Sequence, residues 1–341
     1  DLRKHFRYLG MEKDDIRFNK CAYLDEINKF DYELFNMSPR EAKLIDPINR
    51  LFLQCCNSAI EDAGYGGLKI RGSNTGVFLG YTANLGNLYS RILYELDAEL
   101  FGESLPVNQV SMAASRIAYV NDLKGPTMVI DTACSSSLVA MHTACQQIRS
   151  GECDMALVGG ASITMSPLAG GFTVGFESSE EKTRSFSEGA MGTAVGEGVG
   201  AILLKPLSKA LEDKDSVYGV IKGSSSNQDG SSFGIAAPNY LAQSEVIQKA
   251  WLQSGIEPET ISYIEAHGTG TALGDPIEVK GITHAFQAFT DKKQFCALGT
   301  IKPNIGHLNE ASGISGIIKV LLMMKYRELP PTVFFQEPNQ N

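Results

Sequence analysis

Short apolar runs alternate with longer amphipathic segments along most of the chain. The runs at 75–79, 127–130, 155–158 and 198–204 are rich in Val, Ile and Leu, which predicts buried strands. The longer segments carry apolar residues at helical spacing, as in the helix expected at 47–64. Because strands that alternate with helices form mostly parallel sheets covered by those helices, the pattern predicts the α/β fold class.

The same alternation returns after a charged connector at 205–215. The strands expected in this second part are 217–221, 261–265 and 296–298, and the expected helices are 241–254, 277–289 and 311–325. The recurrence predicts two domains, residues 1–205 and residues 206–341.

Residues that favour the start or end of a helix or strand refine these boundaries. Ser38 and Glu41 form a capping box with Pro39 at the first helical position, which predicts a helix start. A pair of glycines follows the run 155–158 and predicts the end of that strand.

The most distinctive chemistry lies where one predicted strand turns into a helix. Residues 131–138 read DTACSSSL and place Cys134 between the strand 127–130 and a helical pattern. The free N–H groups and dipole of a helix start favour the nucleophilic thiolate. Small neighbours on both sides leave room for an acyl group. The segment therefore indicates either a nucleophile or a buried, inert cysteine, which is the commoner fate of a single cysteine.

Two histidine segments favour the nucleophile. Residues 265–271 read EAHGTGT, and residues 302–307 read KPNIGH. Each places a histidine, His267 or His307, just beyond a predicted strand and next to glycines that let a substrate approach the backbone. Loops at strand ends are where α/β folds carry their chemistry.

Together, these three segments are very similar to the ketosynthase (beta-ketoacyl synthase) domains of modular type I polyketide synthases. Further matching segments occur in the same order along the whole chain: SPREA at 38–42, DP at 46–47, AIEDAG at 59–64, LKGP at 123–126, GECD at 151–154, GEGVG at 196–200 and GDPIE at 274–278. The mixture of Lys, Asn and Ile resembles that of bacterial assembly lines that use a separate acyltransferase, the trans-acyltransferase kind.

The resemblance implies a thiolase-like fold, in which two related halves form a five-layer αβαβα sandwich. The N-terminal half would carry the nucleophilic cysteine and the C-terminal half the two histidines. Ketosynthases normally begin with a further strand before this point and continue beyond it, so both termini are expected to be truncated relative to such domains.

The resemblance also implies a reaction. A ketosynthase accepts an acyl chain from the phosphopantetheine arm of an acyl carrier protein and performs a decarboxylative Claisen condensation with a malonyl-type extender. Cys134 matches the family's nucleophile. His267 and His307 match the pair that stabilises the enolate, and Lys302 matches a lysine that supports them electrostatically.

Two threonines match further family residues, and two short segments differ from the usual family sequence. Thr269 and Thr271 match residues that contact the pantetheine arm. The family usually has Glu-Ala where this chain has Asn309 and Glu310, and residues 190–192 replace a usual acidic-Gly pair. Glu310 is interpreted as structural, and the departures leave substrate preference open.

Other functions are alternatives. A non-elongating ketosynthase, acting as a transacylase or thioester hydrolase, and a fatty-acid-type ketoacyl synthase share the same residues. The loop 268–274 lies between a strand and a helix, as dinucleotide-binding loops do, but its spacing is not G-x-G-x-x-G and Asp275 would repel a pyrophosphate. A nicotinamide oxidoreductase is therefore disfavoured.

Composition narrows the partners and the compartment. The net charge of −9 offers no basic stripe for nucleic acid, and the apolar run 314–324 is too short to span a membrane. Seven cysteines without a C-x-x-C pattern are typical of a reduced cytoplasmic protein, and no metal site is indicated. The resemblance implies a homodimer with neighbouring synthase domains, and no cofactor beyond the carrier-borne arm.

Three charged residues receive structural interpretations. Asp275 and Glu278 begin a predicted helix, where acidic side chains suit the helix dipole, so helix capping is expected of them. Lys319 interrupts an apolar helix face and is expected to snorkel or to form a salt bridge.

Overall fold

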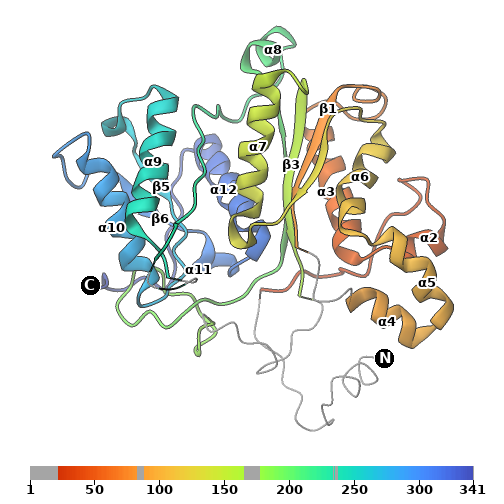
Figure 1. Cartoon of the computed structure of the whole chain (residues 1–341), viewed down its shortest axis with the longest axis horizontal. Helices are drawn as coiled ribbons and strands as arrows, with labels where there is room; N and C mark the ends of the chain where they lie inside the picture. The colour runs from red at the N-terminus through yellow and green to blue at the C-terminus, as the bar shows by residue number, and fades with distance from the viewer. Residues whose placement is uncertain (1–21, 83–87, 165–176, 233, 235–236, 341) are drawn as a thin grey trace. The chain divides into compact units, whose positions relative to one another are not determined.

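The computed structural model describes the whole chain except residues 1–21, 83–87, 165–176, 233, 235–236 and 341 (Figure 1). The chain divides into two compact units. Unit 1 comprises Asp1–Thr173, Glu197–Ser216 and Leu308–Ser315, and unit 2 comprises Val174–Gly196, Val217–His307 and Gly316–Asn341.

Unit 1 contains a four-stranded sheet and most of the N-terminal helices. Its elements are α2 (Pro39–Leu44), α3 (Pro47–Asp62), β1 (Thr75–Gly80), α4 (Leu88–Leu96), α5 (Ala98–Val107), α6 (Val110–Asn121), β2 (Thr127–Ile130), the 3-10 turn η1 (Ala133–Ser135), α7 (Ser136–Ser150), β3 (Met155–Ser162), β4 (Gly198–Leu204), α8 (Leu207–Glu212) and the 3-10 turn η3 (Asn309–Ala311). The strand order is β2-β1-β3-β4. The first three strands are parallel and β4 is antiparallel to β3.

Helices cover both faces of this sheet (Figure 1). Helix α7 packs on β1 and β3 from one side, whereas α6 packs on β1 and β2 and α3 packs on β3 and β4 from the other. The core between α3 and the sheet includes Phe52, Val77 and Leu157, each at most 1% exposed. Burying side chains of this kind stabilises the fold by roughly 1.5–3 kcal/mol each.

Glycine lets α7 approach the sheet at the end of β1. A Cβ on Gly80 would lie 2.4 Å from the backbone nitrogen of Ser137, closer than real Cβ contacts. The first turn of α7 therefore rests directly on the strand backbone. This close contact fixes where the segment between β2 and α7 can lie.

Two boundary predictions in unit 1 have different outcomes. The predicted helix start with a Ser38 cap is confirmed, because the Glu41 N–H donates to the Ser38 hydroxyl at 3.1 Å at the start of α2. The Glu41 carboxylate accepts from Arg116 at 3.5 Å, so the second bond of the capping box stays a prediction. The predicted end of a strand at Gly159 is wrong, since β3 continues to Ser162. A Cβ at Gly159 would lie 2.3 Å from the Phe52 ring, so this glycine serves close packing within a strand.

Unit 2 contains a two-stranded parallel sheet and its covering helices. Its elements are α9 (Tyr240–Ser254), the 3-10 turn η2 (Pro258–Thr260), β5 (Tyr263–Glu265), α10 (Gly274–Gln287), β6 (Ala297–Gly299) and α11 (Lys302–Ile305). Helix α12 (Ser312–Tyr326) begins in unit 1 and ends in unit 2. Helices α9 and α10 pack against each other, and the Trp251 ring stacks at a tilt on Phe286 with 4.6 Å between centroids.

The strand predicted at 217–221 is absent, and this prediction is wrong. The segment has no regular structure, and Val217, Tyr218 and Val220 are between 41% and 49% exposed. An apolar run becomes a strand only where a neighbour completes its hydrogen bonds, and no described strand pairs with this run.

The α/β class with mostly parallel strands is confirmed. The boundary between residues 205 and 206 stays a prediction, because it concerns halves of the sequence whereas the compact units interleave along the chain. Within the described residues, no helix is long and apolar enough to cross a membrane.

Candidate active site

Cys134 lies in unit 1, at the junction that the sequence predicts. It is the middle residue of η1, which follows β2 and leads directly into α7. Ala133 has φ +53°, a left-handed conformation that is unusual for alanine, so the chain turns sharply just before the cysteine. Cys134 itself is half-buried.

Hydroxyl groups hold this turn in shape. The Ser136 hydroxyl accepts from the Thr132 N–H at 2.9 Å and donates to the Ala133 carbonyl at 2.6 Å. The Ser135 hydroxyl donates to the Thr132 carbonyl at 2.8 Å. These bonds take up backbone groups that a left-handed residue would otherwise leave unpaired.

The two histidines follow the carboxyl ends of β5 and β6 in unit 2. These strands are parallel neighbours, with Glu265 opposite Gly299, so the segments that leave them emerge at the same edge. The rings of His267 and His307 lie 5.5 Å apart between centroids and are perpendicular, at 89°. Each histidine therefore lies beyond the carboxyl end of a strand, as the sequence predicts, with α11 between β6 and His307.

Lys302 joins this pair from the start of α11. Its Nζ lies 3.3 Å from His267 Nδ1 and also donates to the His267 carbonyl oxygen. The lysine is only 4% exposed. A buried ammonium beside an imidazole disfavours a second positive charge.

Both imidazoles are accordingly held neutral. The pKa of His307 falls from 6.5 to about 3, because the residue is buried at 2% exposure and because Lys302 is close. The pKa of His267 is also lowered, by burial first, and then by Lys302 and His307. More than a third of the His267 surface is exposed, so solvent weakens the effect of burial on its pKa. The contact with Lys302 Nζ is therefore an important cause of the lowered pKa.

Two carboxylates fix the backbone of the His267 loop. Glu278 accepts from the N–H groups of His267 at 2.6 Å and Gly268 at 2.8 Å. Asp275 accepts from the N–H groups of Gly270 at 3.0 Å and Phe186 at 2.6 Å. The capping interpretation of these residues is wrong, because their oxygens bind the preceding loop and residue 186 rather than the first turn of α10.

A signal for this role was present in the sequence. Asp275 and Glu278 are three residues apart, so they share one face of the first turn of α10. That turn follows the glycine-rich loop immediately, and loop N–H groups need acceptors when they are buried.

A buried ion pair links the end of β5 to helix α12. Lys319 on α12 lies 2.7 Å from the Glu265 carboxylate, and the side chains are 8% and 12% exposed. The same carboxylate accepts from the Ile301 N–H at 2.7 Å, which joins β5 to the chain before α11. The salt-bridge prediction for Lys319 is confirmed.

The remaining predicted site residues lie in the same loop as His267. The hydroxyls of Thr269 and Thr271 are 3.2 Å apart, and the Gly274 N–H donates to that of Thr271 at 3.1 Å. His307 is held by short backbone pairing, since its N–H donates to the Ala194 carbonyl at 2.7 Å. Unit 2 thus brings together His267, His307, Lys302 and both threonines.

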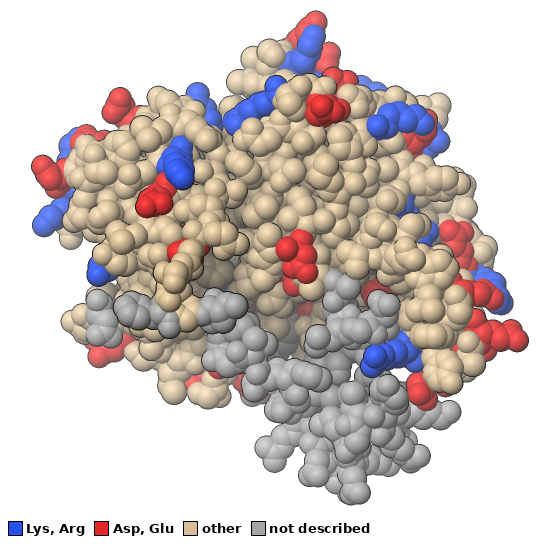
Figure 2. Space-filling view, in the orientation of Figure 1, with Lys and Arg blue, Asp and Glu red and all other residues tan. Residues whose placement is uncertain are grey.

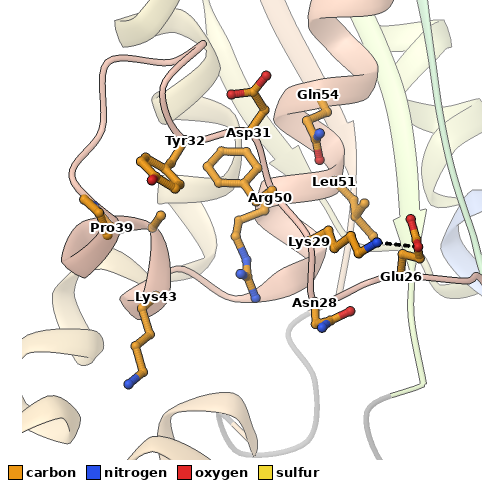
Figure 3. Close-up of a pocket in the computed structure, with 12 residues that line it drawn as sticks. Glu26, Asn28, Lys29, Asp31, Tyr32, Pro39, Lys43, Arg50, Leu51 and Gln54 are labelled. Carbon is orange, nitrogen blue, oxygen red and sulfur yellow. Dashed lines mark hydrogen bonds and ion pairs between the residues drawn. The ribbon is translucent and has the colours of Figure 1, made fainter.

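A separate cavity of about 740 Å³ opens in unit 1 (Figure 3). Residue 26, residues 28–32, α2 and α3 line it. The lining includes Arg50 and an ion pair of 2.5 Å between Lys29 and Glu26. Arg50 is 8% exposed, and its Nε has no hydrogen-bond partner among the described residues. None of the predicted site residues lines this cavity.

Sequence family models give a direct comparison. Residues 9–210 match the beta-ketoacyl synthase N-terminal domain, and residues 218–336 match the beta-ketoacyl synthase C-terminal domain. The chain belongs to the beta-ketoacyl synthase family.

Similar family members come from bacterial polyketide synthases. Polyketide synthase PksL of Bacillus subtilis is 46% identical over 356 residues, covering 100% of this chain and 8% of that protein. Polyketide synthase PksM of the same organism is 44% identical and covers 93% of this chain and 8% of that protein. The chain thus spans about a twelfth of the length of these relatives.

Solved ketosynthases share the fold of this family member. The ketosynthase from module 6 of the bacillaene synthase of Bacillus subtilis matches with a TM-score of 0.85 and 44% identity, over 93% of this chain and 55% of that one. Ketosynthase twelve of the bacillaene synthase of Bacillus amyloliquefaciens matches at 0.86 and 36% identity, over 98% of this chain and 60% of that one. The predicted thiolase-like fold is confirmed, and the layer count stays a prediction.

Proposed function

We propose that this beta-ketoacyl synthase family member elongates a polyketide chain by decarboxylative Claisen condensation, with Cys134 as nucleophile. The observation that carries the proposal is the perpendicular pair of neutral histidines beside a buried lysine. Two neutral imidazoles can each donate an N–H to one carbonyl oxygen, and that is what formation of an enolate requires.

The first half-reaction loads the acyl chain. The Cys134 sulfur attacks the carbonyl carbon of an acyl thioester on a carrier protein, and a tetrahedral oxyanion forms. Its collapse breaks the bond to the pantetheine sulfur, which leaves as a thiol after taking a proton. The acyl chain is then held as a thioester, which divides one difficult condensation into two easier steps.

The second half-reaction forms the carbon–carbon bond. His267 and His307 donate hydrogen bonds to the thioester carbonyl oxygen of a malonyl-type extender, so the electrons released as CO2 departs are accepted there as an enolate. The enolate carbon attacks the Cys134 thioester, and the Cys134 thiolate leaves. Lys302 adds positive charge to the site and keeps His267 a neutral donor.

Partners and location follow from this chemistry. We infer that an acyl carrier protein brings both substrates on its phosphopantetheine arm, with Thr269 and Thr271 contacting the arm, and that no further cofactor is needed. We also infer a homodimer within a larger, trans-acyltransferase synthase in the cytoplasm; of this, the relatives support only a place in a longer polyketide synthase.

The described residues on the face drawn in Figure 2 show no single charged patch for that carrier protein. On the face drawn in Figure 2, Lys and Arg side chains are scattered among Asp and Glu rather than gathered in one patch.

Single substitutions separate the two half-reactions. Cys134→Ala should abolish acyl loading, measured by intact-protein mass spectrometry, while malonyl-thioester decarboxylation continues. His307→Ala should load the acyl chain but release CO2 about 10²–10³-fold more slowly, because one charge-stabilising donor is lost. His267→Ala should resemble His307→Ala.

The control is a histidine outside this pair. His284→Ala on α10 removes an imidazole that contacts Ser244 and should leave both half-reactions at the parent rate. Decarboxylation at the parent rate in both His267→Ala and His307→Ala would show that these residues are structural and that the proposed mechanism is wrong.

A further inference from the structure

Lys319, Tyr263 and Glu265 form a closed polar network in unit 2. The Lys319 ammonium donates to the Glu265 carboxylate at 2.7 Å and to the Tyr263 hydroxyl at 2.9 Å. The Tyr263 hydroxyl donates in turn to the same carboxylate at 2.6 Å. Each of the three side chains therefore binds the other two, and the lysine and the carboxylate are only 8% and 12% exposed.

Two glycines let this network lie against neighbouring backbone. A Cβ on Gly299 of β6 would lie 2.4 Å from the Tyr263 hydroxyl oxygen, and a Cβ on Gly316 of α12 would lie 3.2 Å from Glu265 Cγ. The tyrosine thus packs on the end of β6, and α12 approaches the glutamate closely. The network is fixed among β5, β6 and α12, so the loss of one member would disturb both strand ends.

The network also reaches the segments that carry the catalytic side chains. The second oxygen of Glu265, Oε1, accepts from the N–H of Ile301, the residue immediately before Lys302, at 2.7 Å. Glu265 itself ends β5, two residues before His267. Lys302 Nζ lies 3.3 Å from His267 Nδ1. Glu265 therefore joins the backbone on both sides of the contact between this lysine and this histidine.

The ion pair within the network needs a reason other than stability. Removing two charges from water costs about as much free energy as their attraction returns, and an apolar pair of similar volume often gives a fold that is equally stable. An apolar residue at position 265 could not accept the Ile301 N–H. A carboxylate can, and Lys319 supplies the positive charge that lets it remain ionised where it is buried.

We propose that Glu265 and Lys319 are positioning residues for decarboxylation, which hold Lys302 against His267 while the enolate forms. The inference rests on the proposed function. Stabilisation of an enolate depends on groups whose positions are fixed before the charge develops. A displacement of about 1 Å can cost about 100-fold in rate. A disturbed network should therefore slow decarboxylation without changing how the extender binds.

The test compares decarboxylation with acyl loading in the intact chain within its synthase. Lys319→Met removes the ammonium and keeps a side chain of similar length. Release of CO2 from malonyl N-acetylcysteamine thioester should fall by about 10- to 100-fold in kcat, with little change in KM. Acylation of Cys134, read by mass spectrometry, should keep the parent rate. Lys319→Arg keeps the charge and should recover most of the lost kcat.

A second network of the same composition provides the matched control. In unit 1, the Lys205 ammonium lies 2.7 Å from the Asp215 carboxylate and 2.5 Å from the Tyr65 hydroxyl, and the lysine and the carboxylate are each 13% exposed. Both oxygens of Asp215 accept from the Tyr65 hydroxyl, at 3.1 and 2.9 Å. Lys205→Met should lower the free energy of unfolding, as Lys319→Met does, but should leave the kcat of decarboxylation unchanged.

The outcomes separate this inference from a structural role. If Lys319→Met decarboxylates at the parent rate, loses acyl loading in the same proportion, or is matched by Lys205→Met, the inference is wrong. If Lys319→Met does not fold, Tyr263→Phe and Tyr65→Phe take the place of the two lysine variants. Each removes one hydroxyl of its network, and only Tyr263→Phe should slow decarboxylation; equal rates in this pair would overturn the inference. If the parent releases no CO2 from malonyl thioesters, the proposed function fails and this inference fails with it.

Discussion

Several charged residues act through the backbone of a neighbouring segment rather than through the helix that carries them. Glu278 and Asp275 belong to α10, yet their oxygens bind N–H groups of the His267 loop and of residue 186. Histidine donors work only when their positions are fixed before the charge develops. These carboxylates are therefore positioning residues for the histidine pair.

Reactivity among the cysteines is predicted to be uneven. Burial raises the pKa of Cys55 to about 11, against an ordinary value of 9.0, so its thiolate fraction is about 100-fold lower than that of an ordinary cysteine. Burial also raises the pKa of Cys56, Cys145 and Cys153. An acyl thioester or epoxide electrophile at neutral pH should thus modify Cys134 first, as measured by peptide mapping.

Cys134→Ala provides the control for this prediction. Early labelling should disappear in this variant, while slow labelling at the other sites remains. Early modification of Cys55, Cys145 or Cys153 with Cys134 intact would contradict both the prediction and the assignment of the nucleophile. Cys21 lies outside the described residues.

The roles of single residues could be predicted from the sequence where they depend on neighbouring residues in the chain. The strand–turn–helix context of Cys134 follows from an apolar run, small residues and a helical pattern, all within about twenty residues. The roles of Asp275 and Glu278 depend on how a glycine-rich loop folds back, with Gly268 at φ +49° and Gly270 at φ +69°. Helix propensity does not predict how a loop folds back, and for this reason the sequence indicates helix caps rather than loop acceptors.

Among the elements, glycines set how closely helices approach the strands. Gly80 in β1 and Gly160 in β3 both lie where a side chain would collide with the α7 or η3 segments. From the sequence alone, a glycine that ends a strand cannot be told from one that lets another segment pack closely on the strand. The end predicted for β3 is wrong for this reason. The missing strand at 217–221 has a similar cause, because pairing depends on a neighbour that is distant in sequence.

Gly80→Ala should displace the turn that carries the nucleophile. The added Cβ meets the Ser137 backbone nitrogen at 2.4 Å, and overpacking of this kind costs about 1–3 kcal/mol. We expect a lower free energy of unfolding in chemical denaturation, together with slower acylation of Cys134.

Gly102→Ala in α5 is the matched comparison. A Cβ at Gly102 has no neighbour within 4 Å, and alanine favours a helix over glycine by roughly 1 kcal/mol. This variant should be as stable as the parent or more stable, with unchanged acylation. Equal behaviour of the two variants would rule out the close contact of α7 with β1 as the cause.

For the whole molecule, the buried histidine makes stability depend on pH. The folded pKa of His307 is about 3 and its ordinary value is 6.5, so between these limits the unfolded chain binds a proton that the folded chain does not. The stabilising contribution is present above pH 6.5 and is lost as the pH falls. The expected slope is about 1.4 kcal/mol per pH unit.

His307→Asn isolates this contribution. Urea unfolding of the parent and the variant from pH 7 to pH 4 should show a shallower loss of stability in the variant, whatever its stability at pH 7. The acidic groups titrate in both proteins and cancel in the difference. Parallel curves would mean that His307 is not held neutral by the fold.

The chain passes between the two units five times, at Thr173, Gly196, Ser216, His307 and Ser315. The first unit is completed only by Leu308–Ser315, whose Ile314 is 1% exposed and whose backbone binds Ser137. During synthesis, the packing around Cys134 can therefore be completed only after Leu308–Ser315 has been made. For the same reason, an exchange of this region between members of the family would have to carry Leu308–Ser315 together with the residues around Cys134. A cut at the middle of the sequence would separate the nucleophile's turn from the segment that packs on it.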